Sequence, residues 1–416
     1  MPMKLLMKLL LPPSTKKLLI AYSGGLDSHV LLHLLASLPA SEGLQLRAIH
    51  IEHGLQSVAK QWPKHCAKIC NHLAVHYETI PLNLTIPQGQ SLEAVARKAR
   101  YQAFAQALRK DEVLVTAHHQ DDQAETLLIQ LFRGAGINGL AAMPTMRHFG
   151  KGQQHIRPLL EQSRQALTDY AQQHRLDFIE DPSNQQQCYD RNFLRHEIIP
   201  RLKNRWISIN HILARAAQHQ AEAKHLLAEY IEQDLPNLQG QRNGTLSIAK
   251  LKRLSPPRCK AVIRYFLNKK GFIAPSEKKL RHILADVLNA QPSATPCVRW
   301  QSVETRRYQD DFYVIKPLPT HNIRQIIQWK INQPLQLPRL NRTLTIKQLE
   351  EISELLGEKD QTVEIRFRQG GEKIYQKHRE CTQSLKKLCQ QRHIPTWERD
   401  RIPLIYMNDR LVLVLF

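Results

Sequence analysis

The sequence predicts an α/β protein in which a doubly wound parallel sheet forms the first domain, followed by a helical domain and a small α+β C-terminal domain. Two observations predict the sheet. Short apolar runs at 18–21, 46–51 and 113–116 have the length and composition of buried parallel strands. Segments at 91–109 and 123–132 carry the helical spacing of apolar residues. In such sheets ligands bind beyond the carboxyl ends of the strands, so the site is expected there.

A glycine-rich turn follows the first predicted strand and leads into a helix. Its two adjacent glycines let the backbone turn sharply and approach a ligand, and its serine hydroxyls can meet an anion. We predict a pyrophosphate cradle with Mg2+ near its aspartate; the alternative is an ordinary strand-to-helix turn with a serine cap. The residues are Ser23, Gly24, Gly25, Leu26, Asp27 and Ser28.

A second polar cluster, TAHHQDDQAET at 116–126, directly follows the third apolar run. On a helix that begins here, Asp122 and Glu125 lie three residues apart and share a face near the positive helix end. Paired carboxylates can hold Mg2+ together with substrate phosphates, or receive an ammonium group. The alternative is a capped helix with acidic residues in its first turn.

Two histidines and two arginines complete the candidate site. His50 and His118 fall at the ends of predicted strands, where the switch-point rule places ligands. For His50, a position in the core is the alternative. Arg97 and Arg100 share a helix face with Glu93, so surface ion pairs are the alternative to ligand contacts.

The rest of the chain predicts two further domains. An alanine- and glutamine-rich helical run at 214–235 dominates the second domain, which ends in a hairpin at 298–315. Residues 326–346 then mix prolines with alternating apolar residues, and 362–367 alternate like a strand. The predicted domains are 1–205, 206–320 and 321–416.

The net charge points to a partner rich in phosphate. The 416 residues include 59 basic and 37 acidic side chains, which gives a formal charge of +22. A generally basic surface without a specific partner is the alternative. Two separate clusters favour a long polyanion such as a folded RNA. They are Arg258, Lys260, Arg264, Lys269, Lys270, Lys278, Lys279 and Arg281, and Arg366, Arg368, Lys373, Lys377, Arg379, Lys386, Lys387 and Arg392.

Cysteine usage and hydropathy predict a cytoplasmic protein without a membrane segment. The seven cysteines include no C-x-x-C pair, which argues against a disulfide framework or a zinc ribbon. No stretch approaches the roughly 18 apolar residues of a membrane-spanning helix.

Seven motifs in this order resemble the tRNA(Ile)-lysidine synthetase family of ATP pyrophosphatases. They are SGGLDS, HIEHGL, EAVARKARY, TAHHQDDQAETLL, FRGAGINGLAAM, IRPLL and DPSNQQQCYDRNFLRHEIIP, and the similarity extends to FRQGGE and IPTWER near the C-terminus. The resemblance implies that ATP adenylates the C2 oxygen of the wobble cytidine in the CAU-anticodon isoleucine tRNA. Free L-lysine then displaces AMP. The resemblance does not determine the oligomeric state, and a homodimer is one of the possible states.

The resemblance also implies roles for individual residues. The glycine-rich turn, with His50, Arg100 and His118, would bind ATP. Asp27, Arg97, Asp122 and Glu125 would be catalytic, and the three carboxylates would handle Mg2+ or, at Asp122 and Glu125, lysine. A motif beside the RNA would contain Asp181, Ser183, Asn184, Arg191, Asn192 and Arg195. With the basic clusters, the predicted RNA contacts are Arg191, Asn192, Arg195, Lys269, Lys270, Lys278, Lys279 and Arg368.

Two rivals and two departures accompany this interpretation. A tRNA thiolase would also use SGGLDS, but it needs paired cysteines that this chain lacks. A nonenzymatic RNA-binding module with a degenerate nucleotide fold would not retain Asp27, Asp122 and Glu125. Gln56 stands where the family usually has arginine, and Phe416 falls short of the family's usual last strand.

Overall fold

The computed structural model describes residues 11, 15–39, 43–52, 61–82, 84–89, 91–150, 152–291, 293–330, 336–337, 342–343, 362–376 and 381–416. The chain forms two compact units, Met1–Leu227 and Ala228–Phe416. The division falls within one long helix, α10 (Ile209–Leu238). None of the helices in the described ranges combines the length and apolarity needed to cross a membrane.

The first unit contains a six-stranded sheet in the order β3-β2-β1-β4-β6-β5. All neighbouring strands are parallel except β5, which runs antiparallel to β6 at the edge. The three strands expected from apolar runs are its centre, and the doubly wound α/β prediction is confirmed. The strands are β1 (Lys17–Ala21), β2 (Gln45–Glu52), β3 (His76–Pro81), β4 (Glu112–Val115), β5 (Met146–Phe149) and β6 (Gln153–Ile156).

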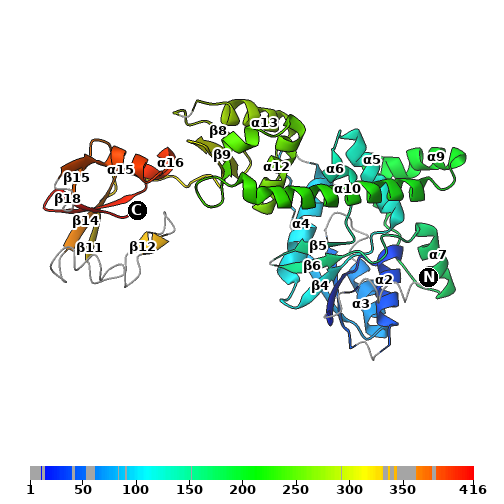
Figure 1. Cartoon of the computed structure of the whole chain (residues 1–416). Helices are drawn as coiled ribbons and strands as arrows, with labels where there is room; N and C mark the ends of the chain where they lie inside the picture. Colours follow the sequence, from blue (N-terminus) through cyan, green and yellow to red (C-terminus); the bar gives the residue numbers. More distant parts are fainter. Residues whose placement is uncertain are drawn as a thin grey trace. The chain divides into compact units, whose positions relative to one another are not determined.

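Helices cover both faces of this sheet (Figure 1). Leu18 and Ile20 of β1 pack into one core with α2 (Leu26–Ala36), α3 (Trp62–His72) and α7 (Arg164–Gln173). Leu19 points the other way, into a core with α4 (Leu92–Ala107). The alternation of side chains along a strand therefore explains why a fully apolar β1 needs helices on both sides.

The remaining helices of this unit surround the carboxyl edge of the sheet. The acidic motif lies on α5, which begins at Gln120 and so includes three residues more than the predicted helix. The helices are α5 (Gln120–Phe132), α6 (Ile137–Leu140), η3 (Pro182–Gln185), α8 (Asp190–Phe193), η4 (Leu194–Ile198) and α9 (Ile199–Arg205).

The second unit consists of two α+β parts. In the first part, helices pack on a sheet of order β7-β10-β9-β8 around a shared apolar core. The predicted hairpin at 298–315 is confirmed, with a third strand, β8, added at its edge. The elements are β7 (Leu246–Ser247), α11 (Ile248–Lys252), α12 (Pro256–Lys269), α13 (Glu277–His282), η5 (Ile283–Leu288), β8 (Cys297–Trp300), β9 (Val303–Tyr308) and β10 (Asp311–Ile315).

The second part contains a sheet of order β11-β14-β17-β18, in which β14 matches the predicted strand at 362–367. Most of the predicted segment at 326–346 lies outside the described residues. The elements are β11 (Ile327–Lys330), β12 (Gln336–Leu337), β13 (Arg342–Thr343), β14 (Thr362–Phe367), β15 (Lys373–Gln376), β16 (Cys381–Ser384), α15 (Leu385–Gln391), α16 (Thr396–Arg399), β17 (Pro403–Met407) and β18 (Arg410–Val414).

Gly24 is the glycine on which the turn after β1 depends most. Its φ is +85°, and a Cβ atom there would lie 2.7 Å from Cδ1 of Ile179 and 2.9 Å from Sγ of Cys66. We predict that Gly24→Ala destabilises the first unit by more than the roughly 1–3 kcal/mol of a strained backbone alone, because a clash is added. The matched control is Gly89→Ala, which has φ of +80° and no atom within 4 Å. Urea unfolding measures the free energy of unfolding of both variants. Equal losses in Gly24→Ala and Gly89→Ala would contradict the prediction.

Candidate active site

The turn after β1 is shaped by its own hydrogen bonds. The hydroxyls of Ser23 and Ser28 lie 3.0 Å apart, and Ser28 donates to the carbonyl of Gly25 at 2.9 Å. The backbone N–H of Ile179 donates to the carbonyl of Gly24 at 2.9 Å, which fixes the turn from outside. Helix α2 begins directly after Gly25, so its first backbone N–H groups have no acceptor within the helix and lie next to the turn. An anion is stabilised at such a helix start.

One buried histidine connects this turn to the acidic helix. Nε2 of His119 lies 3.6 Å from Oδ2 of Asp27 on α2 and 3.5 Å from Oδ2 of Asp122 on α5. The backbone N–H of His119 also donates to Asp122 at 3.1 Å, which caps the start of α5. His119 was not among the predicted site residues. Its position just before the helix start, next to another histidine, was the available signal.

The imidazole and the carboxylates in this cluster each stabilise the charged form of the other. Burial lowers the pKa of His119, but the carboxylates of Asp122 and Asp27 outweigh burial and raise it. Burial raises the pKa of Asp122, but the neighbouring imidazoles and arginines outweigh burial and lower it. Asp122 is therefore ionised, and an imidazolium at His119 is stabilised between two carboxylates.

Glu125 has a different environment from Asp122, although the two share a helix face. Its side chain is 1% exposed and receives Arg195 at both oxygens, with Nε 2.7 Å from Oε1 and Nη2 3.0 Å from Oε2. Nε of Arg191 lies 3.0 Å from Oε2 as well. Burial raises the pKa of Glu125, and Arg195 opposes that shift. Two arginines thus compensate the charge of this carboxylate from α8 and η4.

Some residues of the predicted RNA motif contact the acidic helix α5. Arg195 also reaches Asp122, with Nη2 3.4 Å from Oδ1. Nη2 of Arg191 donates to Thr126 at 2.8 Å. Asn192 donates to the carbonyls of Ser183 and Gln186, so it fixes the preceding loop. The structure therefore places two of the predicted RNA residues against the acidic helix.

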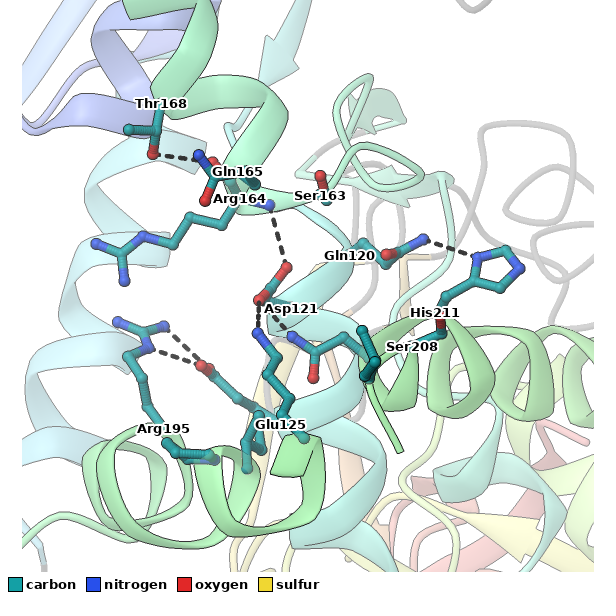
Figure 2. Close-up of a pocket in the computed structure, with 15 residues that line it drawn as sticks. Gln120, Asp121, Glu125, Ser163, Arg164, Gln165, Thr168, Arg195, Ser208 and His211 are labelled. Carbon is teal, nitrogen blue, oxygen red and sulfur yellow. Dashed lines mark hydrogen bonds and ion pairs between the residues drawn. The ribbon is translucent and has the colours of Figure 1, made fainter. Parts of the chain in front are cut away.

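A cavity of about 510 Å³ lies beside the Glu125–Arg195 pair (Figure 2). At its centre, Asp121 accepts from the backbone N–H of Arg164 at 3.1 Å and from the side chain of Asn210, and Lys203 lies 3.8 Å away. Oδ1 of Asn210 is buried, and within the described ranges no hydrogen-bond partner reaches it. The cavity therefore presents both positive and negative groups to a small polar ligand. Its position was not predicted.

The other residues predicted to bind ATP or the modified nucleotide lie in different environments. His50 is buried under the end of β1, donating from Nδ1 to the carbonyl of Tyr22 at 3.1 Å, and burial lowers its pKa. The guanidinium of Arg97 lies over the ring of Tyr101 at 5.3 Å. Burial and the charge of Arg97 lower the pKa of Arg100. Gln56 lies outside the described residues.

Carboxylates of two helices could hold Mg2+ here. Oδ1 of Asp27 is buried and, among the described residues, has no hydrogen-bond partner. The described part of the chain contains no group of three or more metal-ligating side chains. Mg2+ is often bound by only one or two carboxylates, with substrate phosphates and water as the other ligands. Asp27 and Asp122 fit that pattern, whereas both oxygens of Glu125 are already bound by arginines.

The basic cluster between 258 and 281 carries less free charge than its sequence suggests. Three acids, two of them on α10, pair with four of its cations: Asp234 with Arg258, Glu232 with Lys269, and Glu277 with Lys260 and Arg264. Lys270 lies over the ring of Phe266, Lys278 is exposed and Lys279 is half-buried. Arg368 pairs with Asp400 at 3.2 Å. Lys377 and Arg379 lie outside the described residues.

Comparisons with known proteins agree with this arrangement. A family model described as a PP-loop domain matches residues 3–202. Models described as the TilS substrate binding domain and the TilS substrate C-terminal domain match 246–313 and 363–415. These matches define the chain as a PP-loop protein.

Curated relatives then give the particular family. A tRNA(Ile)-lysidine synthase of Coxiella burnetii is 42% identical, covering 100% of this chain and 92% of the relative. Those of Legionella pneumophila (strain Paris) and Methylococcus capsulatus are 39% and 36% identical, covering 96% and 97% of this chain and 91% of each relative. The chain belongs to the tRNA(Ile)-lysidine synthase family. The family expected from the motifs is confirmed.

The pairing of Glu125 gives a prediction about stability. Arg195→Ala leaves a buried carboxylate with Arg191 as its remaining cation, so we expect a loss of up to about 3–5 kcal/mol in the free energy of unfolding. Adding Glu125→Gln should recover part of that loss, because the amide carries no charge. Urea unfolding of the two single variants and the double variant measures the effect.

The control for this cycle is Arg201→Ala. Arg201 pairs with Glu197 at 3.2 Å, but its side chain is 77% exposed. We expect a change within about 1 kcal/mol, as for other surface pairs. Equal losses in Arg195→Ala and Arg201→Ala would contradict the assigned role of the buried pair.

Proposed function

We propose that this chain modifies its tRNA in two chemical steps at the crevice between α2 and α5. The chain is an ATP-using ligase that forms lysidine on tRNA(Ile). In the first step, the C2 oxygen of the wobble cytidine in the CAU anticodon attacks the α-phosphorus of ATP and releases pyrophosphate. In the second, the ε-amine of free L-lysine attacks C2 and AMP leaves. The observation that carries this proposal is the contact, through His119, of the glycine-rich turn at 23–28, below called the phosphate turn, with the acidic helix α5.

The crevice supplies what the first step needs. The N–H groups at the start of α2 would hold phosphate oxygens, and Asp27 and Asp122 would hold Mg2+. When bound, Mg2+ would neutralise charge on the phosphates as pyrophosphate leaves. His119 keeps the two carboxylates close together until then, because its imidazole contacts both.

The cavity beside Glu125 is our candidate site for lysine. Free lysine carries two amino groups and a carboxylate, and the cavity is lined by the carboxylate of Asp121 and the cation of Arg164, with the Glu125–Arg195 pair at its side. The unpartnered Oδ1 of Asn210 can accept from an amino group.

The two-step route is tested by withholding lysine. With ATP and tRNA alone, the wild-type protein should accumulate adenylated tRNA in a single turnover. We expect Asp27→Asn to abolish this adenylate, because Mg2+ and phosphate are no longer positioned. Asp121→Asn should still form it and then react slowly with lysine, with a raised KM for lysine.

Asp169→Asn is the matched control for these variants. Asp169 lies on α7 next to Thr168, which lines the cavity, and accepts a hydrogen bond from Gln165 at 2.8 Å. Both half-reactions should keep their wild-type rates in this variant. If wild-type protein never forms adenylated tRNA without lysine, the two-step route is wrong. An unchanged KM for lysine in Asp121→Asn would instead place lysine elsewhere.

We infer that the segments 206–320 and 321–416 bind the body of the tRNA. The support is their basic character and two cations of α13, Lys278 and Lys279, for which the described residues supply no ion pair. The phosphates of RNA bind such cations with release of counterions. Cytoplasmic location and homodimer formation stay predictions.

Salt dependence distinguishes free from paired cations on this surface. Neutralising Lys278 and Lys279 together by glutamine should weaken tRNA binding and reduce the slope of log affinity against log salt by about 0.7–0.9 per lost contact. The control is Lys260→Gln, since Lys260 already pairs with Glu277 at 2.8 Å. A filter-binding series between low and moderate salt measures both. Equal slopes for the double variant and the wild type would remove α13 from the RNA surface.

A further inference from the structure

A chain of hydrogen bonds behind the site ends at His118. Oγ1 of Thr116 lies 2.7 Å from Nδ1 of His118 and 2.8 Å from Nε2 of His155. Nδ1 of His155 in turn receives Nε of Arg147 at 3.2 Å and lies 3.3 Å from Nη2 of Arg157. His155 is 0% exposed and Thr116 is buried. The chain therefore runs from two guanidinium groups, that of Arg157 buried and that of Arg147 exposed, through buried His155 and Thr116 to the half-buried imidazole of His118.

The arginines fix the direction of every bond in this chain. A guanidinium can only donate, so Nδ1 of His155 must be the acceptor and the proton of that imidazole must be on Nε2. Nε2 of His155 then donates to the hydroxyl of Thr116. The hydroxyl has one proton, which it donates to Nδ1 of His118. His118 consequently carries its own proton on Nε2.

The surroundings keep His118 neutral. Burial lowers the pKa of His118 to about 3, with nearby arginines adding to the effect against the pull of Asp122. Arg97 and Arg147 both lie over the ring of Tyr101 at 5.3 Å, and that ring is 5.9 Å from His155. The imidazole of His118 is only partly buried, and its Nδ1 edge is occupied by Thr116. The ring group that the hydrogen-bond chain leaves for a ligand is therefore the N–H of Nε2.

We propose that His118 is a hydrogen-bond donor that binds a phosphoryl oxygen of ATP through Nε2–H, and that Thr116 and His155 are positioning residues that fix this tautomer. The proposal rests on the adenylation step proposed above. A phosphoryl oxygen is the favoured acceptor because the positive charges of Arg157, Arg191 and Arg97 act on the imidazole, and the next residue, His119, contacts Asp27 of the glycine-rich turn. A preorganised donor of this kind stabilises charge that develops on the oxygens in the transition state.

This assignment removes His118 from the candidates for general base. An imidazole whose Nε2 already carries a proton and whose Nδ1 accepts from Thr116 has no free lone pair for the lysine amine. The proton of the attacking amine must therefore go to a carboxylate or to water.

The tautomer can be measured directly in the full-length protein. Histidine labelled with 15N reports which ring nitrogen is protonated, and the His118→Gln variant identifies the His118 signals among those of the 20 histidines. We expect a protonated Nε2 and an unprotonated Nδ1 in the wild type. Thr116→Val should produce a mixture of tautomers, whereas Thr116→Ser should keep the wild-type pattern. A wild-type proton on Nδ1 would overturn the proposal.

Single-turnover adenylation tests the role of the donor. His118→Ala should slow adenylation at saturating ATP by on the order of 10²–10³-fold. His118→Gln should recover part of this rate, because its amide can place an N–H near the position of Nε2. Thr116→Val should cost about 10–100-fold, as for other partners that orient a histidine, and Thr116→Ser much less. Equal rates for His118→Ala and His118→Gln would overturn the donor role.

ATP binding without tRNA distinguishes the acceptor. A weaker Kd for ATP in His118→Ala, restored in part by His118→Gln, supports a phosphoryl oxygen. An unchanged Kd with a loss confined to the tRNA-dependent step would place the donor at the cytidine oxygen and overturn the proposed ligand. The 15N measurement of the tautomer requires neither ATP nor tRNA. Failure of wild-type protein to form any adenylated tRNA would therefore contradict the proposed function while leaving the tautomer result to be judged separately.

Discussion

The contact of one buried imidazole with two carboxylates is the interaction on which the site depends. His119 lies within 3.6 Å of Asp27 and Asp122, which come from helices that follow different strands. The buried carboxylate of Asp122 needs such a partner, because an unpaired charge is costly away from water, whereas the side chain of Asp27 is 35% exposed. The imidazole offsets both, and by doing so it holds the phosphate turn against the acidic helix. The close approach of β1 and β4 in the sheet makes that contact possible.

The sheet and both principal motifs could be predicted because their signals are local. Apolar runs identify the strands at its centre, and two adjacent glycines identify the turn. The outer strands β3, β5 and β6 were missed since they carry few apolar residues, as in HYETIP, MRHF and QQHI. Their neighbours in the sheet, rather than their own composition, determine that they are strands.

The partners of the site residues could not be predicted, since they come from distant parts of the chain. Arg195 contacts Glu125 across 70 residues of sequence, and no local pattern distinguishes it from an arginine on an RNA surface. The same limit affected the basic cluster of the second unit. A window of sequence around it contains one acid, Glu277, whereas α10 brings Glu232 and Asp234 to it from outside that window.

Two adjacent histidines, His118 and His119, have opposite environments at the turn between β4 and α5. The pKa of His118 is lowered and that of His119 is raised, although the two are consecutive residues. In extended backbone, neighbouring side chains point to opposite sides, so one ring meets Thr116 and the arginines behind it while the other meets Asp27 and Asp122. A single turn thus supplies a neutral donor and a cation side by side. In the proposed reaction the neutral donor binds a phosphoryl oxygen and the cation holds the carboxylates in place. The two rings could exchange these roles only if the backbone between them moved.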